Sequence, residues 1–263
     1  MTVLSDFKAI TSRENSLIKL VSFLQTSAKK RRENGLFVLE GLRICLDAME
    51  NSIRFDKLII SETAIKKYSD TVNSFALNAD GHFVIPDSLF DKISDTKSPQ
   101  GIIAVCKICD RKSSEIDPRG KYVALENVAD PANLGAVSRT AEALGASGLI
   151  LSSDGCDPYS PKALRASMGT LLRVPVFIFD DFASDLKSTG LKSFACVVDK
   201  SAESIKEQKF KDGSVVIIGN EANGITEETK AAADRLVTIP MRGRAESLNA
   251  AAAAAIAVWE MMK

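Results

Sequence analysis

Hydrophobic positions divide the first hundred residues into alternating helix and strand patterns. Four apolar residues recur at helical spacing within residues 14–28, namely Leu17, Leu20, Val21 and Leu24. FVLEGLRICLDAMEN predicts a short strand that runs into a helix, and KLIIS, HFVIP and GIIAVCKI predict further strands. KKRRENG, at residues 29–35, predicts a basic loop. We therefore expect a small α/β domain over residues 1–108.

A polar segment separates this domain from the rest of the chain. Residues 109–119 lack apolar periodicity, include Pro118 and are followed by Gly120, which is typical of an interdomain linker. Beyond it, six apolar runs have the character of buried strands: KYVALENV, SGLILSS, VPVFIF, KSFACVVD, SVVIIGN and RLVTIP. Helical patterns alternate with them, and SLNAAAAAAIAVWEMMK closes the chain as a long helix. Residues 120–263 therefore predict a second α/β domain with a mostly parallel sheet.

Composition limits where such a protein works. No apolar run reaches the roughly 18 residues that a membrane span needs. The N-terminal residues MTVLSDFKAITSRENS lack the apolar segment of an export signal, so we expect a cytoplasmic protein without membrane association. The five cysteines are an odd number and scattered, which favours reduced thiols.

The sequence gives little support to a metal site. Cys106 and Cys109 form a C-x-x-C pair, which is the spacing of half a zinc site or of a redox pair. The alternative is two ordinary residues of the GIIAVCKIC strand, and we favour it. His82, the only histidine, has no cysteine or second histidine near it in the sequence, so no metal is expected.

Charge is distributed unevenly although the net charge is zero. The first 32 residues hold seven Lys or Arg against two acidic residues, an excess of 7 − 2 = +5. This excess ends in four consecutive cations, Lys29, Lys30, Arg31 and Arg32. A local excess of this kind can attract phosphates even on a neutral protein. On charge alone, a solvated helix face followed by a basic loop explains it equally well.

Three polar segments stand out in the second domain, each just past a predicted strand, where open α/β sheets bind ligands. In DPANLGAVSRTAEALGA, Asn133 fits either a helix N-cap or a site residue, and Arg139 fits either a surface position or a phosphate ligand. VVIIGNEANGI brings Gly219, Asn220 and Glu221 to a turn that Gly224 closes. Each of these segments alone leaves the function open.

The third segment is IPMRGRAESLNAAAAAAI, in which an apolar strand leads into a Gly/Arg loop. Ser247 there fits an N-cap, and the pair Ser247 and Asn249 also fits the mouth of a ligand pocket. A nicotinamide-dependent enzyme is disfavoured, because the glycine fingerprint G-x-G-x-x-G is absent after the first strand of this domain.

Together, N-L-G-x-x-x-R, G-N-E-x-x-G-I and I-P-M-x-G-x-x-x-S-L-N resemble the three motifs of the SpoU/TrmH family of RNA 2′-O-methyltransferases. The resemblance covers residues 120–263. It implies a SPOUT-type α/β domain with a mostly parallel sheet and a deep trefoil knot. Residues 1–108 are similar to the ribosomal-protein-like RNA-binding domain that precedes the catalytic domain in many members.

The resemblance also implies site residues and partners. It places S-adenosylmethionine against Gly219, Asn220, Ile239, Met241, Ser247 and Leu248, with further contacts near Asp199. It assigns catalytic roles to Asn133, Arg139, Glu221, Ser247 and Asn249. Lys29, Lys30, Arg31, Arg32 and Arg165 are candidate RNA contacts. Family members are generally homodimers, so Asn133 and Arg139 are expected to lie beside a neighbour's pocket.

The implied reaction moves a methyl group from S-adenosylmethionine to a ribose 2′-hydroxyl of RNA. The extra N-terminal domain favours rRNA as substrate; the alternatives are tRNA, or a non-catalytic RNA-binding or ribosome-assembly factor on the same fold. Arg139 is often drawn as a general base in this family. Since arginine keeps its proton, we hypothesise that Arg139 instead grips a phosphate and stabilises the developing alkoxide.

Overall fold

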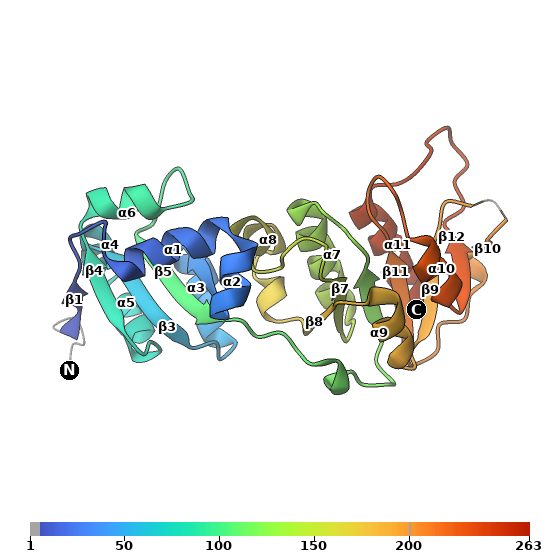
Figure 1. The fold of residues 1–263 in the computed structure, drawn as a ribbon, viewed down its shortest axis with the longest axis horizontal. Coiled ribbons are helices and arrows are strands. Elements are labelled where there is room, and N and C mark those ends of the chain that lie inside the picture. The colour runs from blue at the N-terminus through green and yellow to red at the C-terminus, as the bar shows by residue number, and fades with distance from the viewer. Residues whose placement is uncertain (1–5, 200) are drawn as a thin grey trace. The chain divides into compact units, whose positions relative to one another are not determined.

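The computed structural model describes residues 6–199 and 201–263, which form two compact units (Figure 1). The first unit comprises the described residues up to 108 together with residues 159–164. The second comprises residues 109–158 and the described residues from 165 to 263. Each unit has its own sheet.

The first unit is built on a mixed five-stranded sheet of order β1-β4-β3-β5-β2. Its strands are β1 (Lys8–Ala9), β2 (Leu36–Glu40), β3 (Phe55–Ser61), β4 (His82–Ile85) and β5 (Ile102–Lys107). β5 runs antiparallel to both β2 and β3, whereas β4 pairs in parallel with β1 and β3. The strands predicted from FVLEG, KLIIS, HFVIP and GIIAVCKI are therefore confirmed.

Six helices pack on this sheet. They are α1 (Ser16–Thr26), α2 (Ala28–Asn34), α3 (Leu42–Glu50), α4 (Glu62–Lys67), α5 (Ser69–Leu77) and α6 (Asp87–Ile93). Apolar residues of α1 and α6 pack against one face of the sheet, where Val38, Ile59, Ile103 and Val105 are buried. Because side chains alternate along a strand, the residues between these face the opposite side, and there α3 and α5 contact the strands.

The prediction of a basic loop at residues 29–35 is wrong, because most of that segment is helix α2. The Ser27 side chain accepts a hydrogen bond from the Lys30 backbone N–H and so caps the helix at its N-terminus. Gly35 ends the helix in the left-handed conformation, with φ of 63°. A helix with so little apolar surface escapes a search for hydrophobic periodicity, but its two caps are visible in the sequence.

The second unit is built on a seven-stranded sheet of order β10-β12-β9-β11-β6-β7-β8, in which every paired strand is parallel. Its strands are β6 (Tyr122–Leu125), β7 (Gly148–Ser152), β8 (Val176–Phe179), β9 (Lys192–Cys196), β10 (Glu203–Ser204), β11 (Ser214–Ile218) and β12 (Arg235–Thr238). All six strands predicted for this domain are confirmed. The short edge strand β10 is additional.

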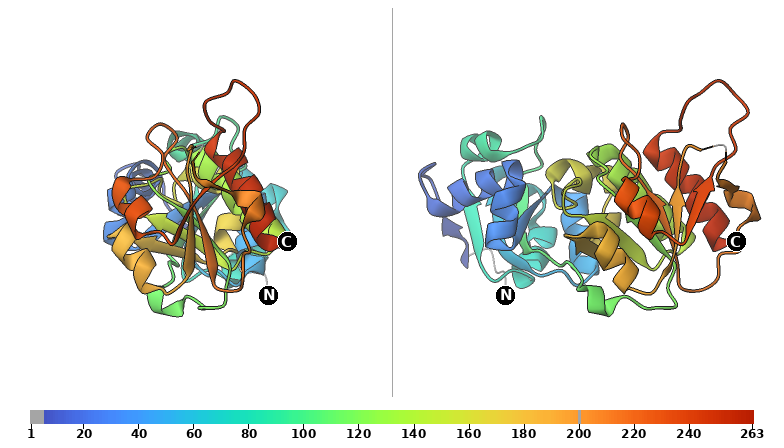
Figure 2. Two further views of the ribbon diagram at one scale, coloured as in Figure 1. Left: turned by 90° about the vertical axis from the view of Figure 1, so that its right-hand side faces the viewer. Right: turned by 45° about the vertical axis from the view of Figure 1, so that its right-hand side comes forward.

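Helices cover both faces of this sheet (Figure 2). They are α7 (Pro131–Leu144), α9 (Phe182–Ser188), α10 (Glu227–Ala232) and α11 (Ala250–Met262), with 3₁₀ turns η2 (Ser113–Glu115), η3 (Thr170–Leu172) and η4 (Ile205–Glu207). Helix α8 (Pro161–Ser167) begins within residues 159–164, which belong to the first unit, and its last residues belong to the second. α7 packs on α11, and α9 packs on α10. Because both faces are covered, the strands β6, β7 and β11 are buried along their whole length.

The predicted fold class, an α/β chain with a large parallel sheet in its C-terminal part, is confirmed. The knot implied by the family resemblance stays a prediction. Over the residues that the structure describes, no helix is long and apolar enough to span a bilayer.

Candidate active site

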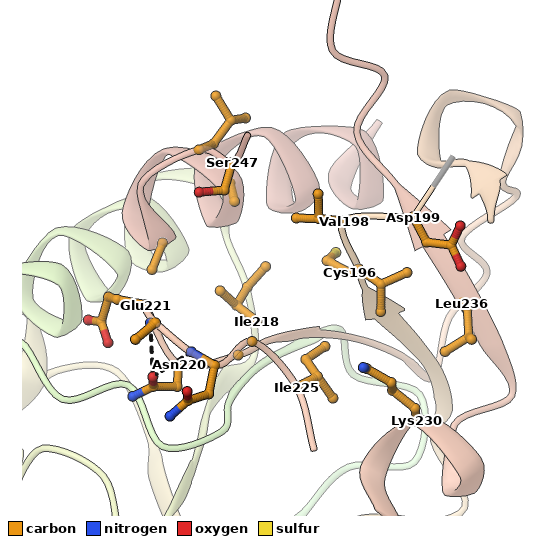
Figure 3. Close-up of a pocket in the computed structure, with 18 residues that line it drawn as sticks. Cys196, Val198, Asp199, Ile218, Asn220, Glu221, Ile225, Lys230, Leu236 and Ser247 are labelled. Carbon is orange, nitrogen blue, oxygen red and sulfur yellow. Dashed lines mark hydrogen bonds between the residues drawn. The ribbon is translucent and has the colours of Figure 1, made fainter. Parts of the chain in front are cut away.

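A cavity of about 460 Å³ opens beside the ends of β9 and β11 in the second unit (Figure 3). The residues that follow these two strands form much of its wall, and the start of α11 forms another part. Its lining includes Cys196, Val198, Asp199, Ile218, Gly219, Asn220, Glu221, Ile225, Lys230, Leu236, Ser247 and Leu248. This position agrees with the general rule that parallel sheets bind ligands beyond the carboxyl ends of their strands.

A tight turn after β11 forms one wall of the cavity. The backbone N–H groups of Asn220 and Gly224 each donate to the other's carbonyl, at 3.0 and 2.9 Å. The Asn220 side chain accepts from the backbone N–H groups of Ala222 and Asn223, and donates to the Asn127 carbonyl at 2.7 Å. A Cβ at Gly219 would lie only 2.2 Å from the backbone carbon of Gly224. Only glycine fits at position 219, which explains the glycine that opens this motif.

A buried carboxylate fixes the far end of the same turn. Glu126 follows β6 and is only 3 % exposed. It accepts hydrogen bonds from the Thr226 hydroxyl and the Thr229 hydroxyl, both at 2.6 Å, and from the Thr226 backbone N–H at 2.9 Å. Nothing in the sequence marks Glu126 as a site residue, because its partners lie about a hundred residues further along the chain.

The three polar segments singled out in the sequence meet at the cavity. The Asn249 side chain donates to the Asn133 side chain at 2.9 Å, and Asn133 donates to the Glu221 carboxylate at 2.7 Å. The other contacts of Glu221 are the backbone N–H groups of Ala129 and Asp130, each at 3.2 Å. One hydrogen-bonded chain therefore joins the start of α7, the turn after β11 and the start of α11.

This arrangement keeps Glu221 ionised. Partial burial opposes its charge, but the hydrogen bonds from Asn133 and from the backbone N–H groups outweigh that effect, so its pKa is lowered. An ionised Glu221 accepts hydrogen bonds only, which fixes the direction of the chain from Asn249 through Asn133.

Two alternatives from the sequence are corrected. The N-cap of α7 is Asp130, whose side chain accepts from the Ala132 backbone N–H, whereas Asn133 is buried inside the first turn. The N-cap of α11 is Asn249, whose side chain accepts from the backbone N–H groups of two alanines that follow it. Ser247 lies outside the helix, at the wall of the cavity. Asn133 and Ser247 therefore do not serve as caps.

Arg139 does not join this hydrogen-bonded chain. It follows Asn133 by six residues on α7, which places it about 120° away around the helix. Asn133 is buried, whereas Arg139 is exposed and has no hydrogen-bond or ion-pair partner among the described residues. Within one chain, the structure thus separates Arg139 from the other four residues to which the resemblance assigns catalytic roles.

Four of the six predicted cofactor contacts line the cavity: Gly219, Asn220, Ser247 and Leu248. Ile239 and Met241 do not line it; they lie in the loop between β12 and α11, where Met241 is 37 % exposed. Cys196, which the sequence did not single out, lies in the wall, and burial raises the pKa of its thiol to about 12. It is therefore an uncharged part of the wall at neutral pH.

The predicted RNA contacts of α2 are mostly engaged within the first unit. Lys29 and Lys30 both pair with Glu33, at 3.8 and 2.7 Å. Arg31 is only 3 % exposed, and its guanidinium donates to the carbonyls of Leu24 and Gln25. Arg32 lies 5.6 Å from the centre of the Tyr159 ring, within the same unit. Arg165, the remaining candidate, is an exposed residue of α8.

The C-x-x-C pair is split by the end of a strand. Cys106 is buried in β5, whereas Cys109 is exposed beyond it. Within residues 6–199 and 201–263, no group of three or more His, Cys, Asp or Glu side chains is placed to hold a metal ion.

Known protein families match the part of the chain that forms this cavity. Residues 120–259, which include all three polar segments, match the SpoU rRNA Methylase family. The chain belongs to that family. Residues 15–104 match the MRM3-like substrate binding domain.

Relatives of this SpoU chain match it over both units. The 23S rRNA (guanosine(2553)-2′-O)-methyltransferase RlmP of Bacillus subtilis is 29% identical, over 97% of this chain and 99% of its own. The 23S rRNA (uridine(2479)-2′-O)-methyltransferase of Streptomyces viridochromogenes is 26% identical, over 97% and 92%. Among solved structures, the AdoMet-bound rRNA methyltransferase from Sinorhizobium meliloti superimposes with a TM-score of 0.84 at 29% identity, covering 97% of each chain.

Proposed function

We propose that this protein transfers the methyl group of S-adenosylmethionine to a ribose 2′-hydroxyl of rRNA. The observation that carries the proposal is the chain from Asn249 through Asn133 to Glu221, which joins the three family motifs at the wall of one cavity. The preference for rRNA rests on relatives named as rRNA methyltransferases that match both units of the chain.

The cavity suits S-adenosylmethionine in size and in chemistry. Its volume of about 460 Å³ lies within the range of small-molecule sites. Ile218, Ile225 and Leu236 offer apolar surface for a planar base, and polar groups lie around them. Gly219 lets the turn after β11 fold without a side chain in the way. When bound, the cofactor supplies a methyl group activated by its sulfonium charge.

The side chains around the cavity would position the reactants. Glu221 and Asn133 hold the turn after β11 against the start of α7, which keeps the wall rigid when the ribose arrives. Ser247, beside them, has a hydroxyl that can hydrogen-bond to the cofactor or the ribose. Arg139 would grip the phosphate next to the target ribose and stabilise the oxygen as its proton leaves.

Arg139 requires a second subunit for this role, because in its own chain it lies on a different side of α7 from Asn133. We propose a homodimer in which Arg139 of one chain acts beside the cavity of the other. Two observations support it: Arg139 has no partner among the described residues, and Trp259 on α11 is 55 % exposed. Aromatic side chains are enriched in protein interfaces, and Trp259 lies on the helix that packs against α7, so its exposure fits this dimer.

Methyl transfer to RNA tests the activity directly. The purified protein should move a labelled methyl group from S-adenosylmethionine to an rRNA transcript or to assembling ribosomal subunits. Mapping 2′-O-methyl groups in RNA from cells with and without the protein should then locate one site in rRNA. Methylation of tRNA alone would overturn the choice of substrate. Binding of RNA without any methyl transfer would favour a non-catalytic assembly factor.

Mixed dimers test the sharing of the site between subunits. Arg139→Ala and Glu221→Gln should each be nearly inactive alone. In a dimer of one chain of each kind, one of the two sites combines an intact Arg139 with an intact Glu221, so mixing the two variants should restore activity. No recovery, with mixed dimers demonstrated by mass spectrometry, would place Arg139 and Glu221 in the same chain's site.

A further inference from the structure

A long exposed loop connects β12 to the wall of the cavity. Residues 240–249, between the end of β12 and the start of α11, are all exposed and form no helix or strand. In both views of Figure 2 this loop, drawn in red, projects away from the sheet and its helices. Its last residues return to the site, since Ser247 and Leu248 line the cavity. The loop therefore joins an exposed surface to the proposed reaction centre.

Arg242 and Arg244 carry the positive charge of this loop. Both are exposed, and neither side chain has a hydrogen-bond or ion-pair partner among the described residues. Glu246, the only acidic residue of the loop, pairs with neither of them. The two arginines flank Gly243 at variable positions of I-P-M-x-G-x-x-x-S-L-N, so the family motif assigns them no role. Two guanidinium groups, each with five hydrogen-bond donors, are therefore left open to a ligand.

The length of the chain keeps both arginines near the cavity. Arg244 lies three residues before Ser247, so even a fully extended chain separates their Cα atoms by at most about 11 Å. For Arg242, five residues before Ser247, the limit is about 18 Å. Successive nucleotides of one strand rise by about 3.4 Å in a duplex. Both arginines therefore stay within a few nucleotides of a ribose bound at the cavity.

The position and charge of the two arginines suit RNA better than the cofactor. Neither arginine lines the cavity. S-adenosylmethionine carries no phosphate, and its single carboxylate stands beside an ammonium. An RNA strand carries one negative charge at every nucleotide, and a guanidinium can bind a phosphate through two parallel hydrogen bonds. Two unpaired arginines outside the cavity therefore fit phosphates of an RNA strand that enters it.

We propose that Arg242 and Arg244 bind backbone phosphates of the RNA strand that carries the target ribose, and so hold that ribose at the cavity. This inference rests on the proposed function, in which Arg139 takes the phosphate next to the ribose. The loop pair binds phosphates further along the same strand. Contacts of this kind position the RNA without reading its bases. They act equally before and during methyl transfer, so they raise affinity for RNA and leave the chemical step unchanged.

The double variant Arg242→Gln, Arg244→Gln tests this role. Filter binding of an rRNA transcript that the wild type methylates should show the slope of log affinity against log salt concentration flattened by about 1.4 to 1.8. The RNA concentration that half-saturates single-turnover methyl transfer should rise at least about tenfold. The rate at saturating RNA should stay unchanged. Calorimetry should give the wild-type affinity for S-adenosylhomocysteine.

The matched control is the double variant Lys187→Gln, Lys211→Gln. It removes the same charge from two exposed lysines that precede β9 and β11, at the ends of these strands away from the cavity. This control should change neither the salt slope nor the half-saturating RNA concentration. An equal effect of both double variants would overturn the proposal, because it would mean that the loop has no special part in RNA binding.

Other outcomes separate this proposal from the function on which it rests. If the arginine variant kept both the salt slope and the half-saturating RNA concentration of the wild type, the loop pair would not bind phosphates. Weaker binding of S-adenosylhomocysteine would assign the arginines to the cofactor, and an altered oligomeric state in size-exclusion chromatography would assign them to a subunit contact. Each of these results overturns the proposal. A wild-type protein that methylates no RNA would instead contradict the proposed function itself.

Discussion

Helices α2 and α7 present their cations in opposite ways. α2 carries four in a row; two of them share Glu33, and Arg31 is buried against carbonyl groups of the preceding helix. α7 carries a single cation, Arg139, which is exposed and has no partner among the described residues. Helix α2 therefore has more positive charge in the sequence than α7, but most of that charge is already paired or buried and is not available to a ligand.

The difference lies in what surrounds each charge. Glu33 is one turn away from Lys29 and Lys30 on the same short helix, so the local excess of charge is partly neutralised before any ligand arrives. The neighbours of Arg139 at the same helix spacing are Gly135, Ala136, Glu142 and Ala143, and Glu142 is bound to Arg173 instead. Small neighbours and an occupied carboxylate leave the Arg139 guanidinium available for a phosphate.

Arg139→Ala should produce the largest effect if the cation of α7 is the functional one. Losing a positioned charge that stabilises a developing oxyanion costs turnover about 10²- to 10³-fold. Turnover would be measured by single-turnover methyl transfer, and cofactor affinity by calorimetry. The affinity for S-adenosylmethionine should stay unchanged, since Arg139 does not line the cavity of its own chain.

Lys187→Ala, which removes an exposed cation from α9, is the control and should leave turnover unchanged. If Arg139→Ala kept near-normal turnover and normal RNA binding, the catalytic role proposed for Arg139 would be wrong.

Arg31→Met tests the other side of the contrast, that this cation of α2 is structural. Its removal leaves the carbonyls of Leu24 and Gln25 without a donor in a buried place, which should lower the free energy of unfolding by about 1–3 kcal/mol. Urea denaturation measures it. Lys29→Met, two residues earlier at an exposed position, should change it by less than about 0.5 kcal/mol. If both variants lowered the free energy of unfolding equally, the buried Arg31 would have no special structural role.

The longer strands of both units were predictable from sequence, because a strand buried on both faces of a sheet needs a continuous apolar run, whereas the two-residue edge strands β1 and β10 show none. SVVII and YVAL show such runs, and they are β11 and β6. A search for apolar patterns did not detect helix α2, whose residues are almost all polar or charged. Its helix is specified by the caps Ser27 and Gly35, which are local signals of another kind.

The candidate site was predictable only as far as its residues belong to recurring motifs. Gly219, Asn220 and Glu221 stand together in the sequence and also in the cavity wall. Glu126 has no such mark, because its role depends on two threonines brought close by the pairing of β6 with β11. Lys230, which also lines the cavity, was equally hidden, since only folding places α10 beside the end of β9.

Neutralising the exposed cations of α2 should change RNA binding only slightly. Each cation that contacts a nucleic-acid phosphate steepens the slope of log affinity against log salt concentration by about 0.7 to 0.9. Because Lys29 and Lys30 share Glu33, we expect the variant with Lys29→Gln, Lys30→Gln and Arg32→Gln to flatten this slope by no more than about one unit. Filter binding of an rRNA transcript over a range of salt measures the slope. A loss of nearly three units would mean that these cations leave their partners for RNA.

Glu221 offers the finest test, since it binds the start of the same α7 that carries Arg139. Its pKa is lowered in the folded protein, because the hydrogen bonds from Asn133 and the backbone outweigh the cost of partial burial. A lowered pKa means that Glu221 stabilises the fold above its ordinary value of 4.5, and that this contribution is lost as the pH falls through the folded-state pKa. Thermal unfolding should therefore separate wild type from Glu221→Gln at pH 7 by a small margin, and the two should converge well below pH 4.5. A difference that persists unchanged into acid would mean that the amide disturbs packing, and that the charge of Glu221 does not hold α7 in place.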